Sequence, residues 1–115
     1  MSADVRQLIA EAASTVKGVT GYPYFVQSTA PGSTEVRLER IDYPNAFGGV
    51  GHWNVVVLLP QDMAQAEKYL DDVVLAKVVP AVAEQLVVTS VVPQRTDFPG
   101  AGVLLAAFIN GHREE

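Results

Sequence analysis

The sequence predicts an α+β fold, with a mainly antiparallel sheet of four or five strands and helices packed on one face of it. Apolar residues near the N-terminus recur at helical spacing, several short runs in the middle of the chain are typical of strands, and a second helical pattern precedes two further strands. The expected order is helix, three strands, one broken helix and two strands. A length of 115 residues suits a single domain, residues 1–115.

The N-terminal helix is expected over residues 5–16, because its apolar residues recur at intervals of three and four and so share one face. Gly18 is suited to end this helix, since glycine accepts the left-handed backbone conformation that follows many helices. Aromatic and β-branched side chains in residues 22–26 predict a short first strand. Proline and glycine in residues 31–33 then predict a turn.

The second strand is expected over residues 34–42, where apolar and charged side chains alternate. Val36 and Leu38 share one face, and the alternation slips near Arg40, which predicts a bulge or the end of burial there. Residues 43–51 contain one proline and three glycines, so they are expected to form a connection of moderate length.

The third strand, residues 53–59, is the most strand-like run in the chain, and it is apolar on both faces. Such a strand is expected to be central in the sheet and covered on both sides. Helices cover one face of the predicted sheet, so the other face needs a second cover.

The second helix is expected to begin at Asp62, whose carboxylate can accept a hydrogen bond from a first-turn amide, with Gln65 three residues later. Pro80 is unfavourable inside a helix, so we expect a break over residues 75–79 and a second helical piece through Leu86.

The last third of the chain predicts two more strands. They are expected over residues 87–92 and 103–109, with residues 93–102 as a loop or hairpin connection. Residues 111–115 are expected to form a short polar tail.

The composition excludes several classes of protein. Without cysteine the chain has no disulfide framework and no thiolate metal site. The net charge of -5 and the eight scattered basic residues argue against a dedicated nucleic-acid binder. No secretory signal or run of about 20 apolar residues is present, so we expect a soluble protein and no membrane contact. Charged residues make up only 18% of the chain, which suggests that part of its surface is covered in the working state.

No catalytic, cofactor or metal site is predicted. His52 and His112 lie sixty residues apart, and neither has a second ligand at helical or hairpin spacing. The glycines of residues 48–51 lack the lysine that follows in a phosphate-binding loop, and no serine is framed as in a nucleophile elbow. An enzyme or ligand-binding domain is the alternative if Tyr24, His52 and Asp62 converge in one pocket.

Contacts with other subunits or partners are the leading candidates for function, since aromatic and arginine side chains are enriched at interfaces. The aromatics beside the glycine- and proline-rich segments have a second interpretation, in which Trp53 and Tyr24 belong to the core. The two arginines of the second strand form either solvated ladders with nearby glutamates or ion pairs between subunits. The candidate contact residues are Tyr43, Phe47, Trp53, Arg37, Arg40 and Phe98.

Several segments together resemble a known family. They are Tyr22-Pro23-Tyr24, Pro31-Gly32-Ser33, Tyr43-Pro44 with Phe47-Gly48-Gly49, residues 53–62, and the closing Gly111-His112-Arg113-Glu114. In this succession the chain resembles the tail terminator proteins of long-tailed actinobacterial phages. The alternatives are another small head-tail connector protein, such as a stopper or adaptor, although adaptors are more helical and stoppers more barrel-like than this chain.

The resemblance implies a structural virion protein and no catalytic residues or cofactor. Its expected form is a homohexameric ring that caps the tail tube, ends tube polymerisation and joins the tail to the head-tail connector protein. The ring would lie at the tail-to-head junction of the virion, after assembly in the host cytoplasm. A neighbouring subunit would cover the second face of the central strands. DNA would pass through the lumen without sequence-specific binding, repelled by a ring charge of about -30 for six copies.

Overall fold

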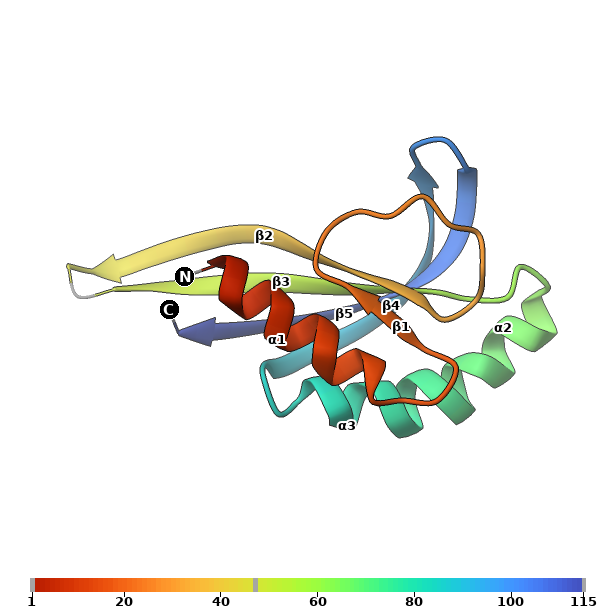
Figure 1. The fold of residues 1–115 in the computed structure, drawn as a ribbon, viewed down its shortest axis with the longest axis horizontal. Helices are drawn as coiled ribbons and strands as arrows, with labels where there is room; N and C mark the ends of the chain where they lie inside the picture. The colour runs from red at the N-terminus through yellow and green to blue at the C-terminus, as the bar shows by residue number, and fades with distance from the viewer. Residues whose placement is uncertain (1, 47, 115) are drawn as a thin grey trace.

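The computed structural model describes residues 2–46 and 48–114. The helices are α1 (Ser2–Ser14), α2 (Met63–Tyr69), the π-helical η1 (Leu70–Val78) and α3 (Val79–Val82), and the strands are β1 (Thr20–Tyr22), β2 (Ser33–Asn45), β3 (Gly48–Leu58), β4 (Val87–Phe98) and β5 (Gly102–Glu114). They form a five-stranded sheet in the order β1-β2-β3-β5-β4, with the helices on one face (Figure 1). This confirms the predicted α+β class and the order of the elements. Among the strands of the described residues, β1 and β2 are the pair that runs parallel, and the other pairs are antiparallel.

The helix α1 follows its predicted apolar stripe and packs against β1 and β2. Gly18 follows it with φ of 82°, which is the expected left-handed conformation. The first strand is earlier than the predicted residues 22–26, because it begins at Thr20 and ends before Pro23. The N–H of Gly21 donates to the Ser14 hydroxyl, 2.8 Å away, so this short strand is tied to the end of the helix that covers it.

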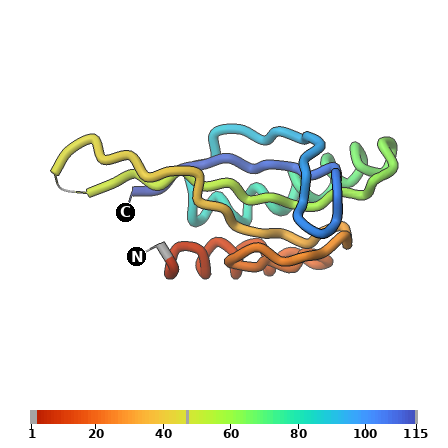
Figure 2. The backbone as a smooth tube through the Cα atoms, turned by 90° about the horizontal axis from the view of Figure 1, so that it is seen from above, coloured from red at the N-terminus to blue at the C-terminus, as the bar shows by residue number. Residues whose placement is uncertain are grey.

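The predicted connection over residues 43–51 is wrong, since β2 and β3 continue through most of it as a long hairpin. We call residues 39–52 of this hairpin the arm; Figure 2 shows it extending past the helices. Pro44 is tolerated because β1 covers β2 only as far as Glu35, so the outer side of the arm has no ladder to interrupt. The bulge predicted near Arg40 is confirmed by a register shift between Leu38 and Arg40.

A glycine in β3 makes room for the side chains of the arm. A Cβ atom at Gly49 would lie 2.6 Å from Cγ2 of Ile41 and 3.0 Å from the ring of Tyr43, so both side chains lie over the bare backbone across the hairpin. Glycine therefore serves here as a packing surface inside a strand, and not as the loop residue that the sequence suggested.

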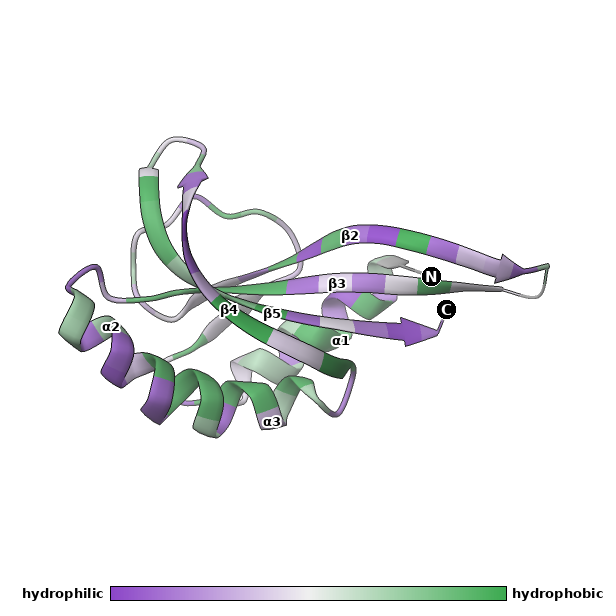
Figure 3. Cartoon of the chain, turned by 180° about the vertical axis from the view of Figure 1, so that it is seen from behind, coloured by the Kyte–Doolittle hydropathy of each residue, from purple (hydrophilic) through white to green (hydrophobic). Residues whose placement is uncertain are grey.

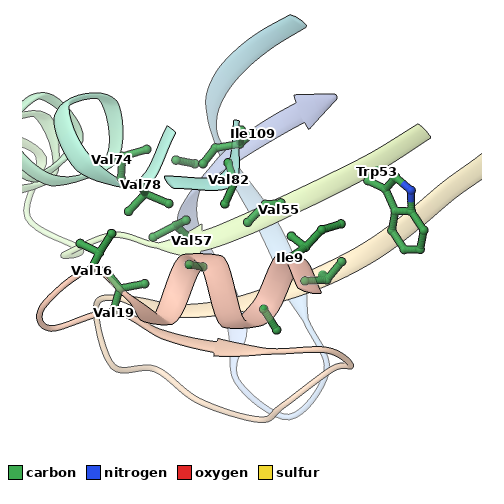
Figure 4. Close-up of a cluster of buried hydrophobic side chains, with 14 of the residues drawn as sticks. Ile9, Val16, Val19, Trp53, Val55, Val57, Val74, Val78, Val82 and Ile109 are labelled. Carbon is green, nitrogen blue, oxygen red and sulfur yellow. The ribbon is translucent and has the colours of Figure 1, made fainter. Parts of the chain in front are cut away.

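The main core lies between the helices and the sheet (Figure 4). As predicted, β3 is apolar on both faces: Val55 and Val57 face the helices, whereas Val56 and Leu58 face the opposite side. Fully buried members of the helix-side core include Ile9, Trp53, Val55, Val57, Val74, Val78, Val82 and Ile109.

The second cover of β3 comes in part from the chain itself. The tip of the β4–β5 hairpin curls over the sheet (Figure 1), and Phe98 joins Val56, Leu58, Ala106 and Phe108 in a second buried cluster. A neighbouring subunit is therefore not needed to bury these side chains. Of the two alternatives for residues 93–102, the hairpin is confirmed and the loop is wrong, because β4 runs to its end at Phe98 and three residues connect it to β5. The predicted polar tail is likewise part of β5.

Asp62 begins the second helix as predicted, and its carboxylate accepts a hydrogen bond of 3.1 Å from the Gln65 amide. The break expected over residues 75–79 is wrong, because α2, η1 and α3 follow one another without interruption. The Val79 N–H donates to the Val74 carbonyl, five residues earlier, as in a π-helix. Pro80 comes directly after these wider turns, at the second residue of α3, and the helical segment continues past it.

The π-helical turns explain a spacing that an α-helix does not fit. Buried or half-buried apolar residues recur at every fourth position of this helical segment: Ala66, Leu70, Val74, Val78 and Val82. In an α-helix, positions four apart drift around the axis by about 40° each time. The wider turns of η1 offset this drift, so that one face stays against the sheet. Figure 3 shows the resulting alternation of hydrophobic and hydrophilic residues along these helices.

Candidate interaction surfaces

Two of the predicted contact residues are buried inside the chain. Trp53 is 0% exposed and Phe98 is 3% exposed, so neither is available to a partner in this conformation. For Trp53, the alternative interpretation as a core residue describes the structure. Tyr24, in contrast, is 56% exposed. Phe47 lies outside the described residues.

Arg37 belongs to an ion pair within the chain. Its guanidinium donates two hydrogen bonds to the carboxylate of Glu35, at 3.0 and 3.3 Å, and the carboxylate is almost fully buried. The same guanidinium lies over the rings of Phe98 and Phe108, with its central carbon 5.4 and 5.7 Å from their centroids. Arg37 therefore stabilises the curled hairpin against the sheet, because it joins a buried carboxylate to two aromatic rings.

Arg40 lies on the arm and is half exposed. Its guanidinium contacts the carboxylates of Glu39 and Asp42, the latter at 3.1 Å, so both ion pairs are within the chain. The same Asp42 oxygen lies 2.9 Å from Nε2 of His52. His52 in turn faces His112 on β5, with a separation of 6.0 Å between ring centroids. Spacing along the chain did not indicate this proximity, because β3 and β5 are neighbours in the sheet but not in the sequence.

The three residues of the alternative enzyme hypothesis have separate surroundings. Tyr24 lies 4.8 Å below the Arg6 guanidinium, His52 contacts Asp42 on the arm, and Asp62 caps α2. They do not form a common site, so this hypothesis loses the convergence that it requires. Within residues 2–46 and 48–114, no three histidine, aspartate or glutamate side chains are grouped so that they could hold a metal ion.

The most exposed large apolar side chain among the described residues is Tyr43, near the end of the arm, with 73% of its surface exposed. One side of its ring lies over Gly49, and the rest faces solvent. Of the predicted contact residues that the structure describes, Tyr43 is the one that a partner could reach most easily.

An apolar recess lies between the first turns of the second helical segment and the sheet. Its volume is about 150 Å³, and its walls are Leu59, Met63, Ala66, Leu70, Pro93 and Leu105, with Glu67 at the rim. Met63 is 54% exposed. Its flexible thioether chain can adapt to an incoming apolar group. The recess was not predicted, since the connection expected over residues 93–102, a loop or hairpin, did not place Pro93 on a strand beside the second helix.

A larger and more open hollow of about 530 Å³ lies beside β2. Arg6, Phe25 and Pro99 are among its walls, and Gln27 of the preceding loop donates to the Gly100 carbonyl at the hairpin tip, 3.2 Å away. The Arg6 guanidinium is held by the carbonyls of Pro23 and Val36. The arginines beside this hollow are therefore engaged in contacts within the chain. The hollow lies where the loop before β2 meets the tip of the β4–β5 hairpin.

Tyr69 offers a test of burial next to the helical segment. Its half-buried ring packs against the main core, and desolvation raises the pKa of its phenol above the ordinary value of 10.0. The folded state therefore holds this proton at pH values where the unfolded state has lost it, so its contribution to stability is present below pH 10 and is lost as the pH rises further. We expect Tyr69→Phe to weaken the fall in stability as the pH rises above 10, measured by urea unfolding. An unchanged slope would contradict the assignment.

No protein-family model matches this chain, and no curated protein matches it. In the described part of the chain, none of the helices combines the length and apolar character that a membrane crossing requires.

Proposed function

We propose that this chain is a structural virion protein that forms a ring at the end of a phage tail tube, stops tube polymerisation and joins the tail to the head connector. The arm is the observation that carries the proposal. It extends a hairpin beyond the helices and exposes Tyr43, whose ring is not part of either buried cluster. Isolated hairpins are marginally stable on their own, so a projecting hairpin of this length suits contact with another molecule.

The sequence resemblance to tail terminators supplies the identity of the partners. They are further copies of the chain, the tail-tube protein and the head-tail connector. A ring of identical subunits uses two different patches on every copy, and both the arm and the recess are available as such patches. A stopper or adaptor is the alternative within the same class of proteins.

The distribution of charge fits passage of DNA without binding. The segment from Asp62 to Glu84 holds five exposed carboxylates against two lysines, so much of the net charge of -5 lies on the helical side. In a ring with this side toward the lumen, the carboxylates would repel the phosphates of a duplex. This orientation is part of the proposal.

The test is a tube-polymerisation assay with the tail-tube protein encoded in the same genome. Increasing amounts of the purified chain should shorten the tubes seen by electron microscopy, with extra density at one tube end. Light scattering should give the chain a mass near six subunits, either free or on the tube. Lys77→Ala, an exposed helix change, should act like the natural chain. Tubes of unchanged length at a molar excess would contradict the proposed function.

A further inference from the structure

The tip of the arm and the apolar recess lie at opposite ends of the molecule. The long axis of the subunit measures 47 Å, and Figure 1 shows the arm at one end and the beginning of α2 at the other. Tyr43 and Met63 of one copy therefore cannot meet each other. They can meet only between two copies, arranged either head to tail or as an antiparallel pair.

The size and character of the recess suit one aromatic ring. An apolar cavity of about 150 Å³ in a protein interior accommodates benzene, and the recess has about that volume. Its walls are aliphatic and it opens beside the exposed Met63. A tyrosine ring placed there would bury its apolar body and keep its hydroxyl at the rim, where polar groups are available.

One charge beside the recess, Arg95, is opposite in sign to the carboxylates of the arm, whereas Glu67, which also lines the recess, has the same sign as they do. Arg95 on β4 pairs in the sheet with Leu105, which is a wall of the recess, and its exposed guanidinium has no ion-pair partner among residues 2–46 and 48–114. The arm has carboxylates at Glu39 and Asp42, and the neighbouring end of β5 adds the exposed Glu114, which pairs in the sheet with Val50. Within the described residues, Arg40 contacts both Glu39 and Asp42, and its single positive charge balances one of these two carboxylates. The arm therefore has an excess of negative charge that can attract a cation such as Arg95.

We infer that the arm of one copy docks into the neighbouring copy, with the ring of Tyr43 in the recess beside Met63 and the carboxylates of the arm next to Arg95. The occupant is thus a second copy of this chain. A head-to-tail contact generates either a closed ring or an open filament. The inference rests on the proposed function for the choice of the closed ring. It names the two patches that the ring would use.

The natural sequence contains no cysteine, so any disulfide cross-link must form between cysteines that are introduced by substitution. In the chain with both Tyr43→Cys and Met63→Cys, mild oxidation should give a ladder of covalent multimers on a non-reducing gel. The matched control replaces Met63→Cys with Leu75→Cys, which is also exposed and lies on η1. The control should give several-fold less cross-linking. Equal cross-linking in both, or none in either, would overturn the docking.

A second measurement does not depend on added thiols. Tyr43→Ser and Met63→Lys should each lower the mass measured by light scattering to that of one subunit, with the thermal unfolding midpoint unchanged. Tyr43→Phe should keep the multimer. If the natural chain is multimeric and all three variants keep its mass, the docking is wrong while the ring stands. If the specific cross-link forms but tube length does not respond, the docking holds and the proposed function fails.

Discussion

Replacing Trp53 with alanine is expected to lower the free energy of unfolding by about 3–5 kcal/mol, the cost of removing a large aromatic side chain from a core. Trp53 is the largest fully buried side chain among the described residues. It lies on the helix-facing side of β3, under the Arg6 guanidinium, whose central carbon is 5.4 Å from the indole ring. Its loss would leave a cavity next to α1 and would remove the aromatic face beneath that cation. Urea unfolding followed by circular dichroism measures the change.

Trp53→Phe measures how much of the cost at this site comes from lost volume. The indole Nε1 is buried and has no hydrogen-bond partner in the described structure. A buried donor without a partner costs about 1–3 kcal/mol, and phenylalanine and alanine both remove it. The two variants therefore differ in the volume that they leave empty, and we expect Trp53→Phe to cost about 2 kcal/mol less than Trp53→Ala because it leaves the smaller cavity. Equal losses for the two variants would show that the lost volume does not decide the cost at this site.

Gly21→Ala is expected to destabilise the fold by about 3 kcal/mol, the upper end of what overpacking costs. The added Cβ would lie well inside contact distance of the Ala10 carbonyl oxygen and 2.9 Å from its carbon. These are backbone atoms of α1, so the clash can be relieved only by moving the helix away from β1. The Val5, Ile9 and Ala13 side chains would then lose contacts in the main core.

Gly18→Ala is the matched control for this substitution. Gly18 has φ of 82°, and no atom lies within 4 Å of the position that an alanine Cβ would take, so alanine there meets strain but no clash. Left-handed backbone costs an L-residue about 1–2 kcal/mol. Thermal and urea unfolding of the two variants should rank Gly21→Ala as the more destabilised. The reverse order would argue against close packing of α1 on β1.

Local sequence patterns predicted the elements that are marked by regularly spaced apolar residues or by a capping residue. The stripe around Ile9 predicted α1, the two-faced run ending at Leu59 predicted the central strand, and Asp62 predicted the start of α2. In each case the deciding interaction lies within a few residues of the pattern. The slip near Arg40 also predicted the bulge, since a change of phase in the alternation is itself local.

The errors arose where a distant segment decides the local structure. Pro44 and the glycines near Gly49 are typical of loops, but an outer edge without a neighbour tolerates the proline and the ring of Tyr43 covers the glycine. Pro80 suggested a break, whereas the π-helical turns before it keep Val78 and Val82 on the sheet. Neither effect is visible without knowing which element packs against which.

The candidate surface was predicted only in part. Tyr43 and Arg40 are exposed on the arm as expected, but Trp53 and Phe98 are core residues. Aromatic side chains are enriched in both interfaces and cores, so residue type alone could not separate these cases. The recess beside Met63 depends on strands that meet across the sheet, and no spacing in the sequence indicated it.

The order of the strands has a consequence for the kinetics of folding. The β2–β3 and β4–β5 hairpins are local, but they are joined by pairs such as Leu58 and Ala106, which are 48 residues apart along the chain. Closing such a long loop is slow compared with hairpin formation. The same β5 that completes the core also pairs with the base of the arm, up to Val50. The arm is therefore supported by β5 only late in folding, after the long loop between the two hairpins has closed.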